Sequence, residues 1–213
     1  MPSAEIVARL AALTPYLLGG FALNLLVSAV AMAVGTLAGW GLALLRLSAL
    51  PRRQRFALRL TEVTRGVPTI VFQFYLALVL PSQLPLPGDW GTLAFPAWLK
   101  AALALAVAVV GFTSDNLAIA LHDWRLGRHR AAILFVPSWT GYALIIVMAS
   151  STASIIGVGE LLSRCNSAIN ASGSTRLMLP IYLYACAIFF GFCFPLTLLM
   201  RQVSRRLALR LPA

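Results

Sequence analysis

Long apolar runs dominate the pattern of this chain. Stretches without a charged residue cover residues 10–45, 66–88, 101–114, 131–159 and 177–200. A membrane-spanning helix needs about 20 predominantly apolar residues, because only a helix satisfies its own backbone hydrogen bonds in hydrocarbon. The pattern predicts an all-α integral membrane protein that forms one transmembrane domain over residues 1–213. We place its five spans at about 14–46, 66–82, 98–120, 131–152 and 177–200.

Three segments do not follow the simple pattern of one helix per run. The run 10–45 is too long for one untilted span, so residues 10–20 are expected to lie at the interface before a steep helix. The segment 81–96 contains four prolines and two glycines, which exclude a regular helix and predict an outer loop. The polar segment 150–176 is expected to be irregular, either re-entrant or lining a pore.

The third run is too short to span a membrane alone. It must extend back across Lys100, which can snorkel toward the surface, or forward across Asp115. A charge inside a span is costly, so an embedded Asp115 suggests a functional role. In the alternative, the third helix ends at Ser114 and residues 114–130 form an amphipathic cytoplasmic helix. The residues alone leave both alternatives open.

Composition and charge support the membrane interpretation and set its orientation. Hydrophobic residues make up 60% of the chain and charged residues 11%, against roughly 25% charged in soluble domains. The net charge of +11 would suggest nucleic acid in a soluble protein, but here most arginines lie between apolar runs. The segments 46–65, 125–130 and 201–210 hold most of them. By the positive-inside rule these segments are cytoplasmic, so the N-terminus is outside and the C-terminus cytoplasmic.

Signatures of enzymes and of bound cofactors are absent from the sequence. It contains no GxSxG, CxxC or Walker A motif, and its two histidines and three cysteines lack metal-ligand spacing. An intramembrane enzyme needs a paired nucleophile and base, and Asp115 is the only acid available in the spans. We therefore expect no catalytic residue, no metal site and no cofactor bound by this chain, and any energy from ATP must come from another polypeptide.

Two groups of residues are candidates for function. Glu62 and Arg65 are three apart, a spacing at which opposite charges pair on a helix, and Gly66 and Pro68 follow them. This pattern predicts a hinge or gate at the entrance to the second span, or alternatively an ordinary helix junction. The second group is a possible polar lining of a cavity, although single amides in spans often only bond a neighbouring helix. It comprises Asn24, Gln73, Asp115, Asn116, Ser150 and Ser151.

These residues belong to a pattern that resembles a known family. The string LTPYLLGGFALNLLVSAVAMAVGTLAGWGLALLRLS, then ExxRGxP at 62–68 and VFQFYLALVLP, is similar to the permease subunits of polar amino-acid ABC importers of the His/Glu/Gln/Arg/opine type. IIGVGELL at 155–162 resembles the same family, and the likeness covers nearly the whole chain. It implies a type I ABC importer membrane domain that moves a small polar solute, an amino acid, across the bacterial inner membrane.

The resemblance also implies partners. They are a second permease in a heterodimer, ATP-binding subunits that hold ATP and Mg²⁺, a periplasmic solute-binding protein and membrane lipid, with no nucleic acid. Family members carry a Glu-Ala-Ala loop that docks on the ATPase, but residues 118–137 lack this element and are shorter. The resemblance implies that the remnant of the ATPase-contacting loop consists of Arg125, Leu126, Gly127 and Arg128. The alternative is a degenerate, non-transporting subunit that serves assembly or regulation.

Overall fold

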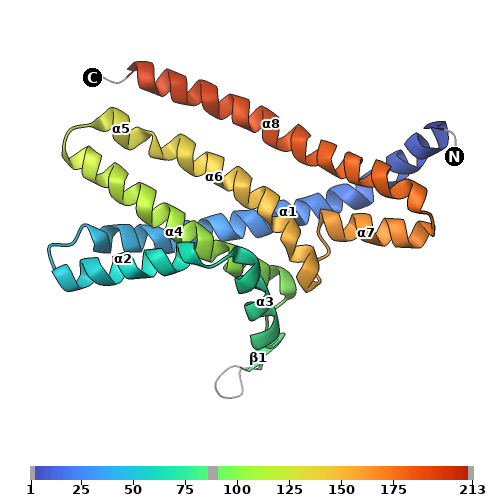
Figure 1. The fold of residues 1–213 in the computed structure, drawn as a ribbon, viewed down its shortest axis with the longest axis horizontal. Helices are drawn as coiled ribbons and strands as arrows, with labels where there is room; N and C mark the ends of the chain where they lie inside the picture. The colour runs from blue at the N-terminus through green and yellow to red at the C-terminus, as the bar shows by residue number, and fades with distance from the viewer. Residues whose placement is uncertain (1–2, 86–90, 211–213) are drawn as a thin grey trace.

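The computed structural model describes residues 3–85 and 91–210, and almost all of this part is helical. Along the chain the elements are α1 (Ser3–Arg46), α2 (Pro51–Gly66), α3 (Thr69–Val79), β1 (Gln83–Pro85), β2 (Thr92–Ala94), α4 (Ala97–Arg125), α5 (His129–Ile133), α6 (Phe135–Ala149), the 3-10 helix η1 (Ser150–Ile156), α7 (Leu161–Ser172), the 3-10 helix η2 (Thr175–Leu177) and α8 (Met178–Arg210). Figure 1 shows α1 crossing α4 and α6, with α8 along one side.

Among the described residues, four helical segments combine the length and apolar character that a membrane crossing requires. They are Glu5–Arg46, Ala97–Arg125, His129–Ile156 and Thr175–Arg206. The predicted second span, 66–82, contains the apolar helix α3, which has 11 residues. At 1.5 Å per residue α3 rises about 16 Å, roughly half of a hydrocarbon core. The chain thus has the character of a membrane protein with four long candidate spans and one short apolar helix.

The first run of the sequence forms one continuous helix. We expected residues 10–20 to be a separate interfacial segment, but α1 passes through them and through Pro15 without a break. Proline removes only one backbone hydrogen bond, and the contacts of α1 with α7 and α8 support the helix around it. The 44 residues of α1 therefore form one continuous helix along the bundle.

The third run also forms one helix. α4 continues from Ala97 to Arg125, so the alternative in which this helix ends at Ser114 is wrong. The expectation that Lys100 snorkels is wrong as well, because its side chain is buried. Its ammonium group donates hydrogen bonds to the carbonyl oxygens of Ala77, at 3.4 Å, and Leu80. Carbonyl groups at the C-terminus of α3 replace water around this charge.

Two glycines allow α1 and α4 to approach closely. A Cβ atom on Gly35 would lie 2.4 Å from the Cβ of Val109, and one on Gly39 would lie 2.7 Å from the Cβ of Thr113. Small residues four apart on one helix permit this backbone-to-backbone contact, a common device between membrane helices. Val27, Ala31, Leu105 and Val109 form part of the core beside this contact. The α1–α4 crossing is therefore the packed centre of the fold.

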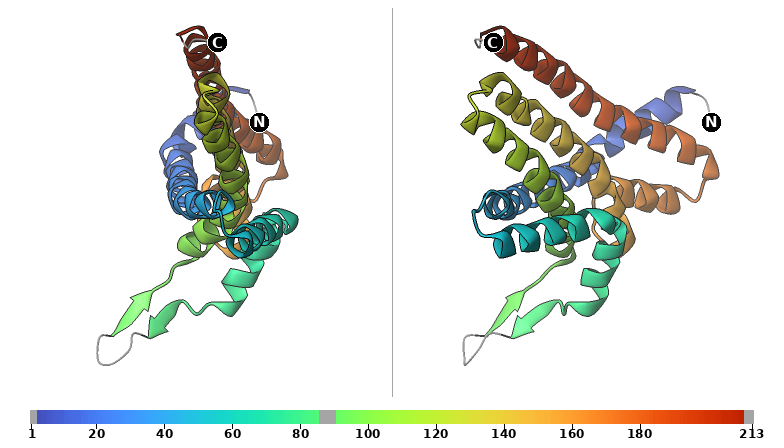
Figure 2. Two further views of the ribbon diagram at one scale, coloured as in Figure 1. Left: turned by 90° about the vertical axis from the view of Figure 1, so that its left-hand side faces the viewer. Right: turned by 60° about the vertical axis from the view of Figure 1, so that its left-hand side comes forward.

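The proline-rich segment 81–96 contains a small hairpin in its described part. β1 and β2 pair antiparallel, with Gln83 opposite Ala94 and Pro85 opposite Thr92. The two strands project away from the helices in all three views (Figures 1 and 2). The fold is all-α apart from these strands.

The polar segment 150–176 is more regular than we expected. η1 continues the line of α6, α7 forms three turns of helix, and η2 leads into α8. Gly157, with φ of 87°, and Gly173, with φ of 60°, end η1 and α7 in the left-handed conformation that glycine favours. The segment is thus a chain of short helices that reverses direction between α6 and α8.

The arginine-bearing ends of the long helices lie on the same side of the molecule. α1 ends at Arg46, α4 ends at Arg125, and the last part of α8 carries Arg201, Arg205 and Arg206. In Figure 1 these three ends are on the left-hand side, whereas the N-terminus lies on the right. The fold therefore gathers most of the positive charge at one end of the bundle.

We expect the α1–α4 crossing to fail when a side chain is added at Gly35. Gly35→Leu should lower the free energy of unfolding by about 1–3 kcal/mol, because the added atoms overlap Val109. Gly41→Leu is the matched control, since no atom lies within 4 Å of a Cβ at Gly41. Thermal unfolding of the purified variants in detergent, followed by tryptophan fluorescence, measures the difference. Equal midpoints for the two variants would contradict this account of the crossing.

Candidate functional site

A cluster of three charges joins three helices at the arginine-bearing end of the bundle. Asp115 of α4 accepts hydrogen bonds from Arg46 of α1 on one carboxylate oxygen and from Arg65 of α2 on the other. The side chain of Asp115 is 21% exposed, that of Arg46 is 17% exposed and that of Arg65 is 64% exposed. The cluster carries a net charge of one positive, and Arg65 presents most of that charge to the surroundings.

Hydroxyl groups support the same junction. The side chains of Thr61 on α2 and Ser114 on α4 are buried, and their oxygens lie 2.8 Å apart in a hydrogen bond. Arg46 also donates to the Ser114 hydroxyl at 3.5 Å. Buried polar groups of this kind are stable because each has a partner. The C-terminal part of α2 is consequently fixed to the middle of α4.

A pocket of about 750 Å³ opens beside this cluster. The junction between α2 and α3 forms one wall, α4 forms the second, and Tyr142 of α6 completes it. The ring of Tyr142 stacks on Phe112 with centroids 3.9 Å apart, and its hydroxyl donates to the carbonyl oxygen of Ala108 at 3.3 Å. We name this the Asp115 pocket; its polar lining comes from Thr64, Arg65, Thr69, Asp115, Asn116 and Tyr142.

The structure places the predicted hinge residues next to this pocket. Arg65 and Pro68 line it, and Gly66 is the last residue of α2. The predicted pairing of Glu62 with Arg65 is wrong, since Arg65 pairs with Asp115 and no ion pair joins it to Glu62 in the part of the chain described. Glu62 is exposed to water. An ion pair of Arg65 with Glu62 would therefore be weaker than the pair of Arg65 with the partly buried carboxylate of Asp115. The junction between α2 and α3 is thus held by an ion pair with α4, not by an ion pair within α2.

Two of the predicted cavity residues instead form a buried network with a residue that the sequence did not single out. Nδ2 of Asn24 donates to Ser150 Oγ at 2.9 Å and to Glu160 Oε2 at 3.0 Å. Oδ1 of the Asn24 side chain accepts the backbone N–H of Leu161 at 3.1 Å. Asn24 and Glu160 are fully buried and Ser150 is 1% exposed. Asn24 and Ser150 lie outside the lining of the Asp115 pocket and connect α1 to the start of α7.

Glu160 caps α7 from within the protein. Its carboxylate accepts the N–H groups of Leu162 at 3.0 Å and Ser163 at 2.9 Å. Burial raises the pKa of Glu160, and the hydrogen bonds from Leu162, Asn24 and Ser163 oppose that rise. The signal that could have found this residue is an acidic side chain after Gly157 and Gly159, at the start of a helical pattern.

The remaining two predicted cavity residues also lie away from the Asp115 pocket. Gln73 of α3 is buried, and its Oε1 accepts a hydrogen bond from Thr152 at 2.9 Å. Its Nε2 has no hydrogen-bond partner within the described residues. Ser151 donates to the carbonyl oxygen of Met148 at 2.8 Å. Of the predicted lining residues, Asp115 and Asn116 are the two that the pocket contains.

The segment predicted to contact an ATPase is a tight turn. α4 ends at Arg125, and Gly127 adopts a φ of 77°. Arg128 turns back to pair with Asp123, with Nη2 and Oδ1 2.6 Å apart. α5 follows with only five residues. Residues 125–128 are exposed, but they form no protruding helix.

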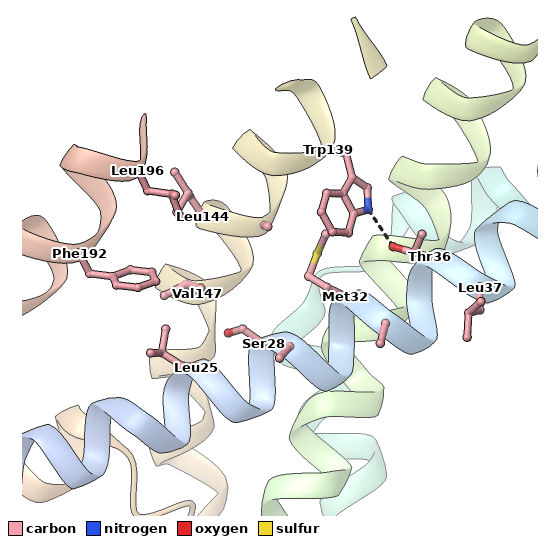
Figure 3. A pocket seen from close by; sticks show the side chains of 13 residues that line it. Leu25, Ser28, Met32, Thr36, Leu37, Trp139, Leu144, Val147, Phe192 and Leu196 are labelled. Atoms are coloured by element: carbon pink, nitrogen blue, oxygen red, sulfur yellow. Dashed lines mark hydrogen bonds between the residues drawn. The ribbon is translucent and has the colours of Figure 1, made fainter. Parts of the chain in front are cut away.

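A second hollow, on another side of α1, is almost entirely apolar. This apolar groove of about 700 Å³ lies between α1, α6 and α8 and is lined by residues that include Leu25, Met32, Val147 and Phe192 (Figure 3). Figure 3 draws one hydrogen bond in this groove, which Trp139 Nε1 donates to Thr36 Oγ1 at 2.8 Å. A polar solute would lose hydrogen bonds to water there without replacement. The Asp115 pocket is therefore the better candidate for a polar ligand.

Comparison with known proteins places the fold. The sequence matches no family model and no curated protein. A chain from the "Crystal structure of an amino acid ABC transporter with histidines" superposes with a TM-score of 0.75 at 20% sequence identity. The match covers 93% of this chain and 97% of that one. The protein thus has the fold of a chain of an amino acid ABC transporter over nearly its whole length.

The buried network predicts a large effect of Glu160. Glu160→Ala should lower the free energy of unfolding by about 2–4 kcal/mol, since it removes the cap of α7 and one of the two acceptors of the buried Asn24 amide. Glu5→Ala removes a carboxylate from an exposed pair with Arg9 and should change stability by less than about 0.5 kcal/mol. Thermal unfolding in detergent compares the two. A small shift for Glu160→Ala would contradict the structural role of the network.

Proposed function

We propose that this chain is a permease subunit of an ATP-driven ABC importer that moves a small polar solute, an amino acid, across the bacterial inner membrane. The observation that carries the proposal is the Asp115 pocket, a polar hollow at the junction of α2 and α3 in an otherwise apolar helical fold. The fold shared with a chain of an amino acid ABC transporter supports it. A second permease, ATP-binding subunits and a periplasmic solute-binding protein would complete the complex, in which the partners hold ATP and Mg²⁺.

In the proposed topology the chain crosses the membrane five times. The four long apolar segments supply four crossings, and the uncharged stretch around α3 supplies the fifth. An odd number of crossings puts the termini on opposite sides, in agreement with the arginines gathered at one end of the bundle. The N-terminus then lies outside, and Arg46, Arg65 and the end of α8 lie at the cytoplasmic side.

The Asp115 pocket suggests how such a subunit works. Glu62, Arg65, Gly66 and Pro68 form the hinge between α2 and α3, and Asp115 fixes this hinge to α4 through Arg65. The net positive charge of the cluster suits the carboxylate of an amino acid, and Asn116 and Tyr142 offer further polar contacts. ATP binding to the partner subunits favours one of two arrangements of the helices, because a ligand shifts an equilibrium through its differential affinity for the two states.

The tight turn at residues 125–128 favours an asymmetric complex, in which the partner permease makes most of the contact with the ATPase. The same turn supports a second candidate function. A membrane subunit that serves only assembly or regulation also needs no protruding ATPase-docking helix. The two candidates differ in one respect, since only the first requires a working solute pocket in this chain.

We expect Asp115→Asn to reduce ATP-dependent uptake at least tenfold in proteoliposomes that contain the complete complex. The substitution removes the negative charge between Arg46 and Arg65, so the two guanidinium groups repel and the hinge loses its attachment to α4. Glu5→Gln, at the far end of α1, is the control and should transport normally. Unchanged uptake with Asp115→Asn, in a complex that still assembles, would favour the assembly or regulatory function.

The asymmetry gives a separate prediction about coupling. Alanine substitution of residues 125–128 should reduce solute-stimulated ATP hydrolysis less than an equivalent change in the docking loop of the partner permease. The physical reason is that a tight turn offers little surface to the ATPase. ATP hydrolysis with and without solute measures both losses. Equal losses would contradict the asymmetric complex.

A further inference from the structure

A third hollow, separate from the Asp115 pocket, lies between the facing sides of α6 and α8. It encloses about 530 Å³, and we name it the α6–α8 cleft. From α6 it is lined by Pro137, Gly141, Ile145 and Met148. From α8 it is lined by Met200 and, toward the C-terminus, by two arginines. One end of the cleft is thus apolar and the other is positively charged.

The spacing of these residues makes the cleft continuous along both helices. Positions 137, 141, 145 and 148 are three or four apart, so they follow one face of α6. Positions 197, 201 and 205 do the same on α8. Gly141 leaves its middle open, since no atom lies within 4 Å of the position that a Cβ would take. An extended apolar chain can therefore lie across Gly141 without displacing a side chain.

The two arginines at the charged end of the cleft have no acidic partner among the described residues. Arg201 and Arg205 are exposed, and neither guanidinium pairs with a carboxylate among the described residues. The nearby Ser204 hydroxyl donates to the carbonyl oxygen of Met200 at 2.8 Å, so it leaves both guanidinium groups free. Two unpaired cations one helical turn apart form a site for an anion such as a phosphodiester.

The position of the cleft determines which anion can reach it. The segments His129–Ile156 and Thr175–Arg206, which hold α6 and most of α8, are both long and apolar enough to cross a membrane. Leu144 lines both the cleft and the apolar groove of Figure 3, so the apolar surface continues from one hollow to the other. A ligand that fits must have an apolar chain inside the bilayer and an anionic group at the arginine-bearing end.

We propose that the α6–α8 cleft binds an anionic phospholipid from the membrane leaflet on the arginine-bearing side. One acyl chain lies along Gly141, and the phosphate group contacts Arg201 and Arg205. Basic pockets between membrane helices recognise anionic headgroups in this way. The lipid would fill the space between α6 and α8 and fix the distance between their arginine-bearing ends.

Binding of a fluorescent phosphatidylglycerol to the purified chain in detergent tests this proposal. The double variant Arg201→Gln/Arg205→Gln should bind at least tenfold more weakly than the unaltered chain. Arg52→Gln/Arg53→Gln removes the same charge from the exposed start of α2 and should bind normally. Gly141→Leu should weaken binding as well, because it fills the cleft, and it should fold because the space is open.

Three results would overturn the proposal. One is equal binding of the lipid by the Arg201→Gln/Arg205→Gln and Arg52→Gln/Arg53→Gln variants, which would show that binding depends only on the net charge of the chain. Another is unchanged binding by Gly141→Leu with an unaltered unfolding midpoint, which means that no acyl chain lies in the cleft. The third is full competition by inorganic phosphate, which identifies a site for a free anion. The assay contains no solute, ATPase or second permease, so its failure is distinguishable from failure of the proposed transport function.

Discussion

The close crossing of α1 and α4 is the contact on which the rest of this structure depends. Gly35 and Gly39 let the two backbones meet, and this fixes the register of one helix against the other. Toward the C-terminus of α1, the same register brings Arg46 to Asp115. Toward the N-terminus of α1, Asn24 bonds to Ser150 of η1 and to Glu160 at the start of α7. The charged cluster and the buried network thus lie on either side of one packing contact.

Each buried or half-buried charge near this crossing has a specific partner, as a low-dielectric environment requires. Carbonyl groups at the end of α3 surround Lys100, two arginines pair with Asp115, and an amide and two backbone N–H groups satisfy Glu160. The first and third of these hold helices together. The second differs, because its most exposed member, Arg65, opens into a pocket. That difference separates structural polar residues from a candidate ligand site in this fold.

The sequence was informative where local pattern determines structure. Apolar runs predicted the long helices, prolines excluded a helix from the described part of segment 81–96, and Gly66 with Pro68 marked the break between α2 and α3. It was less informative where distant residues meet. Arg65 could not be assigned to Asp115, 50 positions away, and Glu160 could not be recognised as the partner of Asn24, 136 positions away. Single amides and carboxylates carry no local signal that distinguishes a helix–helix contact from a cavity lining.

The proposed topology places the two termini on opposite sides of the membrane and the arginine-bearing ends of the helices in the cytoplasm. Labelling of single cysteines in intact cells tests it most directly, in a chain whose three native cysteines are replaced. Ala8→Cys should react with a membrane-impermeant maleimide from outside, whereas Gln54→Cys and Gln202→Cys should react only after the membrane is permeabilised. Labelling of Gln202→Cys from outside, or of all three positions alike, would contradict the account.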